Sequence, residues 1–193
     1  MSKKEKHNDG SIIIETSIVL PLFMFMFLFI YGLFGVVRTQ NIVTHSLFQS
    51  SKSLSLDPYL TEHVTSMSEA DTFWSSCGDI ILDEFVRLNN SKYFSSKTNW
   101  YDSSATAYYN NSSSNELAKN RFIGYFSGGD EKVADEKLKA LGVVNGLDGI
   151  KVEMKVSGDD MTIKLNYEIQ IWFDMFDLGK IPIEQEVTAR LWK

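Results

Sequence analysis

The sequence has few of the residue types from which catalytic and metal sites are built. Cysteine occurs once, at Cys77, and the three histidines (His7, His45 and His63) lie far apart along the 193 residues. A single cysteine excludes an intramolecular disulfide, and no zinc-ligand spacing, P-loop, dinucleotide or Gly-x-Ser-x-Gly motif is present. We therefore expect no catalytic residues, no metal site and no cofactor. Cys77 is either a buried small hydrophobe, which we favour, or a reactive thiol.

Two groups of acidic residues imitate functional motifs. Residues 128–131 read Gly-Gly-Asp-Glu, like the start of a diguanylate cyclase signature, but Lys132 stands where that family has Phe. We predict instead that Asp130 caps a helix over 131–141 and that Glu131 lies at its positive end. The second group is too sparse for a calcium loop and is interpreted as turn and surface residues: Asp159, Asp160, Asp174 and Asp177.

Positive charge is in the minority overall and is concentrated at the N-terminus. The chain carries 19 Lys and Arg residues against 25 Asp and Glu residues, for a net charge of −6. Residues 1–10 are net positive, with three lysines against Glu5 and Asp9, so the remainder of the chain is acidic. An acidic chain argues against nucleic acid, and against an anionic membrane surface, as the main partner.

One long apolar run dominates the N-terminal quarter. No charged residue occurs from Ile18 to Val37, and about 20 helical residues span roughly 30 Å, the thickness of the hydrocarbon core of a bilayer. The run has no polar stripe, exceeds the length of a secretory signal and lacks a small-x-small exit. We predict a transmembrane helix over about 18–37, with the lysine-containing N-terminus inside and the C-terminal domain outside the cytoplasm.

Glu15 places a carboxylate inside the N-terminal edge of this apolar segment. A charged side chain costs about 2.5–3.5 kcal/mol at the bilayer centre and less near the interface. Two interpretations remain open: the carboxylate snorkels to the headgroups, or it has a partner. Gly10 stands five residues before Glu15, with the residues from Ser11 to Ile14 between them. This is the layout of a prepilin-peptidase substrate.

Residues 10–52 resemble the N-terminus of TadE-like proteins, the minor pilins or pseudopilins of Tad/Flp tight-adherence pili. Gly10, Glu15 and Pro21 match the family's spacing, and a polar helical extension follows the apolar run. The resemblance implies cleavage by prepilin peptidase between Gly10 and Ser11. It also implies that the new amine of Ser11 pairs with Glu15 of a neighbouring subunit. Pro21 either loosens the helix for assembly or is a harmless membrane proline.

Beyond the apolar run the helix is predicted to continue as a spine. It would end at about Ser55, because Pro58 follows, and would be about 45 residues and roughly 67 Å long. Apolar residues at three- or four-residue spacing would pack on a globular domain: Val36, Val43, Leu47 and Leu54. Polar residues between them would stay in water: Gln40, Thr44 and Ser51.

The middle of the chain predicts helices separated by a polar loop. A capping box and helical apolar spacing favour a helix over about 66–89, and two short helices follow near 115–127 and 131–141, the second ended by Gly142. The Ser-, Asn- and Tyr-rich segment 91–114 is predicted to be a surface loop. Its aromatic residues would hold it against the core: Tyr93, Phe94, Trp100 and Tyr101.

The C-terminal third predicts a sheet. Apolar and polar residues alternate over 151–156, 161–171 and 181–191, and Ser157 to Asp160 form a turn between the first two segments. Three antiparallel strands with one apolar face need a cover, which the spine helix offers. The sequence therefore predicts an α+β fold of pilin-like outline.

Together these patterns predict three regions: a leader peptide over 1–10, a transmembrane and spine helix over 11–57, and an extracytoplasmic α+β domain over 58–193. The expected protein is a minor pilin or pseudopilin in the cytoplasmic (inner) membrane. Its partners would be prepilin peptidase, other pilins, the pilus assembly platform and membrane lipid. One alternative is a single-span membrane protein whose outer domain binds a ligand or the envelope. An anchored hydrolase is disfavoured, since no nucleophile–base pair is found.

Overall fold

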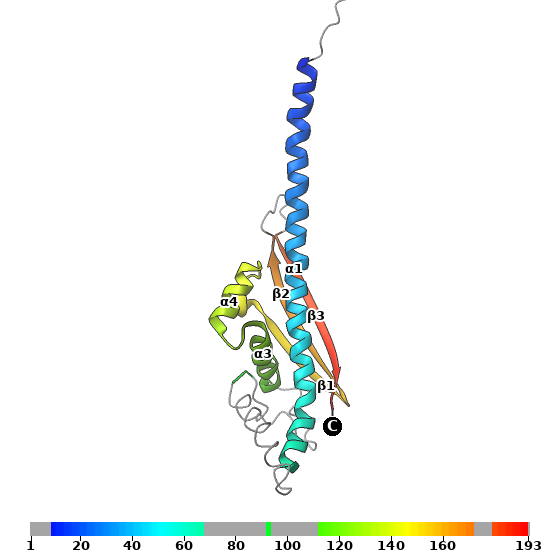
Figure 1. The fold of residues 1–193 in the computed structure, drawn as a ribbon, viewed down its shortest axis with the longest axis vertical. Coiled ribbons are helices and arrows are strands. Elements are labelled where there is room, and N and C mark those ends of the chain that lie inside the picture. Colours follow the sequence, from blue (N-terminus) through cyan, green and yellow to red (C-terminus); the bar gives the residue numbers. More distant parts are fainter. Residues whose placement is uncertain (1–8, 68–91, 94–111, 172–178, 193) are drawn as a thin grey trace, which may run out of the picture.

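The computed structural model describes residues 9–67, 92–93, 112–171 and 179–192. A long helix, α1 (Asp9–Met67), runs along one side of a small domain and projects far beyond it (Figure 1). The domain contains α3 (Ser112–Ser127), α4 (Glu131–Ala140), a 3₁₀ turn (Gly146–Gly149), and the strands β1 (Lys151–Ser157), β2 (Asp160–Gln170) and β3 (Lys180–Arg190). The predicted α+β class is confirmed.

Helix α1 is longer than its sequence predicts. It comprises 59 residues and continues through Pro58 to Met67, so the predicted end near Ser55 is wrong. A proline inside a helix removes a donor and crowds the carbonyl four residues earlier. Contacts with distant parts of the chain support the helix here, because the Trp192 amide donates to the Ser55 carbonyl at 3.0 Å and Pro58 is fully buried. Tertiary packing overrides the local signal.

The sheet agrees closely with the predicted alternation. Its order is β1-β2-β3, both pairs are antiparallel, and the register places Ser157 opposite Asp160 and Ile163 opposite Val187. Gly158 takes a φ of 65° in the β1–β2 turn, a conformation that favours glycine. The inward residues of β2 are buried: Met161, Ile163, Leu165, Tyr167 and Ile169. Because the side-chain period of a strand is two, this pattern alone fixes which face is covered.

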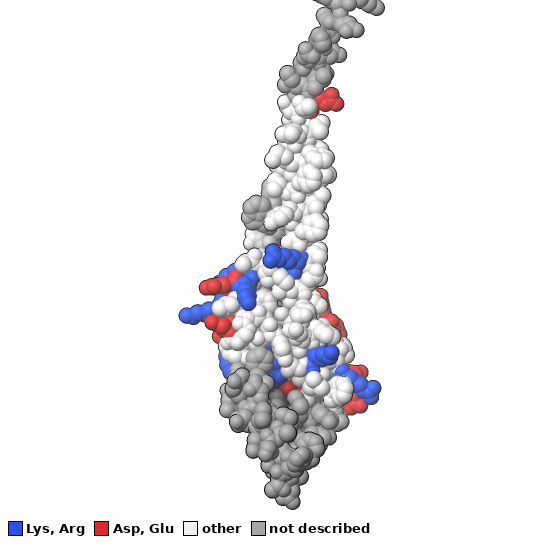
Figure 2. Space-filling model, in the orientation of Figure 1, with Lys and Arg blue, Asp and Glu red and all other residues white. Residues whose placement is uncertain are grey.

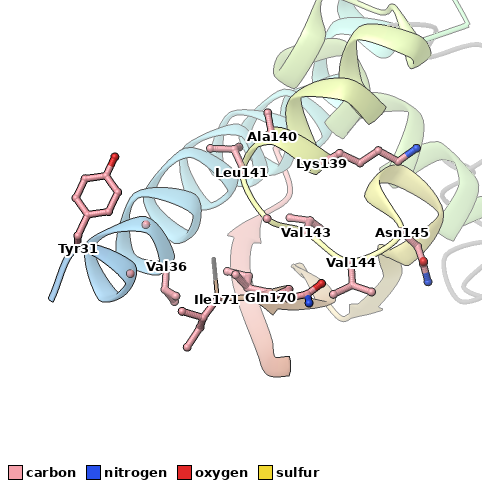
Figure 3. A pocket seen from close by; sticks show the side chains of 14 residues that line it. Tyr31, Val36, Lys139, Ala140, Leu141, Val143, Val144, Asn145, Gln170 and Ile171 are labelled. Carbon is pink, nitrogen blue, oxygen red and sulfur yellow. The ribbon is translucent and has the colours of Figure 1, made fainter. Parts of the chain in front are cut away.

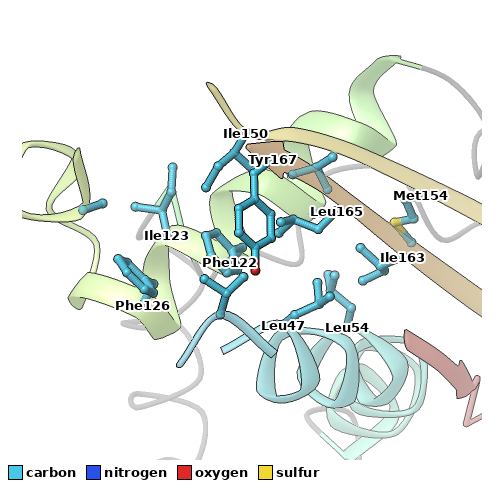
Figure 4. Close-up of a cluster of buried hydrophobic side chains, with 14 of the residues drawn as sticks. Leu47, Leu54, Phe122, Ile123, Phe126, Ile150, Met154, Ile163, Leu165 and Tyr167 are labelled. Atoms are coloured by element: carbon cyan, nitrogen blue, oxygen red, sulfur yellow. The ribbon is translucent and has the colours of Figure 1, made fainter. Parts of the chain in front are cut away.

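The core lies between α1, α3 and the sheet (Figure 4). Three residues of the predicted stripe, Val43, Leu47 and Leu54, are completely buried. They meet Phe122 of α3 and the inner face of β2 in one apolar cluster. Ser51, predicted to stay in water, is buried instead. Its hydroxyl donates to the Phe48 carbonyl at 2.9 Å, so it is satisfied within the helix and is tolerated in the interior.

The segment around α4 matches its predicted start and end. The Asp130 carboxylate accepts from the backbone amides of Lys132 and Val133 at 2.9 and 3.1 Å, which confirms the predicted cap. Gly142, with a φ of 83°, follows the end of the helix. Tyr93 packs against the core as predicted and donates its hydroxyl to Glu131 at 3.2 Å.

Some predictions concern residues that the structure does not describe. The predicted helix over 66–89 lies outside the described residues from 68 onward, and so do Cys77, Phe94, Trp100 and Tyr101. The predicted loop over 91–114 is wrong at its end, because α3 begins at Ser112. Ser114 is fully buried, so this turn is part of the packed domain.

Candidate membrane and assembly helix

The projecting half of α1 is an exposed apolar rod. Among the residues that the structure describes, α1 is the one helix long and apolar enough to cross a membrane, and its apolar window is almost entirely uncovered. Large side chains along it are open to their surroundings, for example Leu22, Phe27 and Phe34. In Figure 2 the visible face of this stretch shows one acidic side chain near its tip and no charge between that point and the domain, whereas side chains of both signs are scattered over the described part of the domain. A bilayer removes the cost of exposing such a surface to water.

The four predicted processing and assembly residues all lie on the N-terminal part of α1. Gly10 and Ser11 fall in its first turn, and Glu15 is exposed one turn further along. Ser11 and Glu15 are four residues apart, so they share one face of the helix. Pro21 is exposed, and α1 continues through it as a helix. The structure thus places these residues on one continuous element, and their roles remain predictions.

A groove of about 620 Å³ separates α1 from the top of the domain, where the apolar rod meets the sheet. One wall is formed by Tyr31, Gly32, Gly35 and Val36 of α1, and the other by the 139–145 segment and the end of β2 (Figure 3). The Thr39 hydroxyl lies 2.8 Å from the Leu141 carbonyl and ties α1 to this segment.

Two glycines on α1 in this groove differ in how much room they have. A β-carbon at Gly32 would lie 3.1 Å from Ile171 Cγ2, whereas one at Gly35 would meet nothing within 4 Å. Gly35→Ala should therefore stabilise the protein by about 0.5–1 kcal/mol through helix propensity, raising the Tm by about 1–4 °C. Gly32→Ala should increase the stability less, because the Ile171 side chain must move to make room for the new β-carbon. Circular dichroism melts of both variants in detergent check this, and an equal gain at Gly32 would contradict it.

A buried ion pair joins α1 to α3 at the far end of the domain. Arg121 Nη2 lies 2.7 Å from Asp57 Oδ2, Arg121 Nη1 lies 3.3 Å from Asp57 Oδ1, and Nη1 also donates to Ser53 Oγ at 2.6 Å. The two charged side chains are only 3% and 5% exposed. Nothing in the sequence signals this pair, because Asp57 simply precedes a proline that is expected to end the helix.

A second polar link joins α1 to the sheet. Gln185 on β3 donates to the Gln40 carbonyl at 3.2 Å and to the Tyr167 hydroxyl at 3.1 Å. Burial raises the pKa of Tyr167 well above its usual range, so its hydroxyl stays neutral. Together with the Trp192–Ser55 bond, this contact holds the C-terminal half of β3 alongside α1.

No family model matches the chain, and no curated protein or solved structure matches it either. Within the described residues, no three His, Cys, Asp or Glu side chains converge in a way that could hold a metal ion. Function is therefore inferred from the long helix and from the domain packed against it.

Proposed function

We propose that this protein is a TadE-like minor pilin or pseudopilin of a Tad/Flp-type pilus, cleaved by prepilin peptidase after Gly10. One observation carries the proposal: a single 59-residue helix places the Gly10, Glu15 and Pro21 spacing at the tip of an exposed apolar rod. The same helix forms one side of the core of a compact α+β domain. One half of α1 is thus suited to lipid or to other apolar helices, and the other half carries a domain outside the membrane.

The charge on Glu15 gives the assembly step its physical basis. In lipid, an isolated carboxylate is unfavourable, and a nearby ammonium group lowers that cost because opposite charges attract strongly at low dielectric. Cleavage after Gly10 creates such an ammonium group on Ser11. A pair between Ser11 of one subunit and Glu15 of the next favours one axial position of the two helices. The major pilins of this family resemble short helices, so a chain with this domain fits a minor subunit.

The alternative is a plain single-span membrane protein whose outer domain binds a ligand or the envelope. The exposed rod, the groove and the packed domain are equally compatible with this alternative. The two proposals differ at the N-terminus, because a plain anchor keeps residues 1–10 attached and has no use for the spacing between Gly10 and Glu15.

The N-terminus of the membrane-extracted protein tests the two proposals. We expect N-terminal sequencing to begin at Ser11, and Gly10→Val to leave the lysine-containing head attached, because a branched β-carbon crowds the approach of the protease to the backbone. Gly35→Val lies on the same helix, at a position where an added β-carbon would meet no atom within 4 Å, so it serves as the control and should be cleaved normally. An intact N-terminus on a correctly inserted protein would favour the plain anchor.

A further inference from the structure

Helix α1 carries an ordered stripe of exposed side chains along the domain. The stripe advances in alternating steps of four and three residues and consists of Phe34, Arg38, Asn41, His45, Phe48 and Lys52. We call it the outer seam. All six residues are exposed, and Phe34 and Phe48 are 67% and 51% exposed although they are aromatic. The 4-3 spacing is that of a helix seam that packs on a second helix.

The outer seam lies opposite the side of α1 that the domain covers. Val43, Leu47 and Leu54, which face the core, fall about half a helical turn away from the seam. The seam also continues in step along the exposed rod through Leu20, Met24, Phe27 and Tyr31, all of them exposed. A second helix beside the rod in the membrane therefore meets the outer seam when it leaves the membrane.

The outer seam is basic in a chain that is acidic overall. Arg38 and Lys52 are the only charged residues between Thr16 and Leu56, and both lie on the seam, whereas the whole chain has a net charge of −6. Lys52 Nζ lies 5.6 Å from the centroid of the Phe48 ring. Among the described residues, neither Arg38 nor Lys52 forms an ion pair. The seam thus combines aromatic surface with positive charge suited to a carboxylate-bearing partner.

Lipid headgroups do not account for this charge. Arg38 directly follows the apolar run and can reach them. Lys52 lies roughly 21 Å further along the helix at 1.5 Å per residue, whereas the headgroup layer is only about 5–8 Å thick. A partner that meets the whole seam is therefore a protein.

A second copy of this chain does not fit either. Both copies would be anchored by the same end, so their helices would run parallel. Pairing in register would then place Arg38 against Arg38 and Lys52 against Lys52, and a shift of seven residues would place Arg38 against His45. No carboxylate occurs on the outer seam to offset this repulsion.

We propose that the outer seam binds a parallel helix of a different membrane-anchored subunit. That helix carries carboxylates opposite Arg38 and Lys52 and apolar side chains opposite Phe34 and Phe48. The inference rests on the proposed function for the presence of a second anchored helix, and it adds the chemistry that selects this helix. The seam repels a second copy, which carries the same charges, and attracts the partner, which carries opposite charges. The contact is therefore selective for a different subunit.

The test is photo-crosslinking of the full-length chain in the membrane of cells that carry its assembly partners. Phe48 is replaced by benzoylphenylalanine, and Tyr125, an exposed aromatic residue on α3, is replaced in the same way as a control. We expect position 48 to form an adduct with a different protein. Mass spectrometry should place the attachment in a carboxylate-bearing helix just beyond the partner's own apolar span. Position 125 should not give this adduct.

Charge reversal then tests the proposed chemistry. Arg38→Glu with Lys52→Glu should lower the yield of the adduct about tenfold or more, and changing the partner's facing carboxylates to lysine should restore it. Lys151→Glu with Lys155→Glu makes the same change of charge on the exposed side of β1 and should have little effect.

Three results would overturn the proposal: an adduct of twice the chain's own mass, an adduct with lipid alone, or a yield unaffected by charge reversal at the seam. The adduct and the N-terminal sequence together distinguish failure of this proposal from failure of the proposed function. An intact N-terminus with a charge-dependent adduct would reject the pilin assignment and keep the seam. A chain that begins at Ser11 but forms no such adduct would keep the pilin assignment and reject the seam.

Discussion

Replacing Asp57 by alanine is expected to lower the free energy of unfolding by about 3–5 kcal/mol, a large part of the stability of a domain of this size. The substitution leaves the Arg121 guanidinium in a site where the side chain is only 3% exposed and removes the carboxylate that accepts from it at 2.7 and 3.3 Å. A buried cation that loses its counter-charge carries its full desolvation cost. The pair also joins α1 to α3, so the helix beyond Pro58 should loosen.

Chemical denaturation of the full-length protein in detergent, followed by near-ultraviolet circular dichroism, measures this effect. Lys164→Ala is the matched control, because its 2.9 Å pair with Glu186 is 34% and 47% exposed, and we expect a loss below about 1 kcal/mol. Replacing both buried partners by Asp57→Leu and Arg121→Met should recover most of the loss, because no charge is then buried alone. An Asp57→Ala loss no larger than that of Lys164→Ala would show that water reaches this pair.

If the proposed function holds, changing Glu15 to glutamine is expected to reduce co-purification with partner pilins about tenfold or more while leaving cleavage after Gly10 intact. A neutral amide keeps the size of the side chain and loses the charge that attracts the Ser11 ammonium group. Glu153→Gln, at an exposed position of β1, makes the same chemical change in the α+β domain and should leave co-purification unchanged.

A pull-down from detergent-solubilised membranes, with an intact mass for each variant, measures assembly and cleavage together. Because Ser11 and Glu15 lie on one face of α1, the amine of Ser11 is also about one helical turn from Glu15 of its own chain. If Glu15→Gln co-purifies as well as the unaltered protein does, a charge pair between subunits is ruled out, even when the chain begins at Ser11.

The strands and α4 could be predicted from the sequence because their signals are local. Alternation over successive strand residues fixes the covered face, and Asp130 caps α4 by reaching amides two and three residues ahead. The end of α1 could not be predicted in this way. Pro58 is a strong local stop signal, but it is fully buried, and the carbonyl of Ser55, three residues earlier, accepts a hydrogen bond from Trp192, far away in the sequence.

In the candidate site, too, local features could be predicted from the sequence and long-range contacts could not. The apolar run and the spacing of Gly10, Glu15 and Pro21 are visible in the sequence, and the structure adds that one continuous helix carries them. The partnership of Asp57 with Arg121 spans 64 residues and has no local signature. The 4-3 spacing of the outer seam can also be read from the sequence. The exposure of the seam could not be predicted, because the positions of α3 and the sheet decide which side of α1 is covered.

The parallel course of α1 and β3 has a mechanical consequence. The two elements lie side by side (Figure 1), linked by Gln185–Gln40 at the middle of β3 and by Trp192–Ser55 just beyond its C-terminal end. A force that pulls on the projecting N-terminal end of α1 while the domain is held acts along the shared axis of helix and strand. The load is then shear, which many contacts along the interface resist at once, instead of a peeling force that breaks them one after another. The domain is thereby attached to α1 in the orientation that best withstands tension.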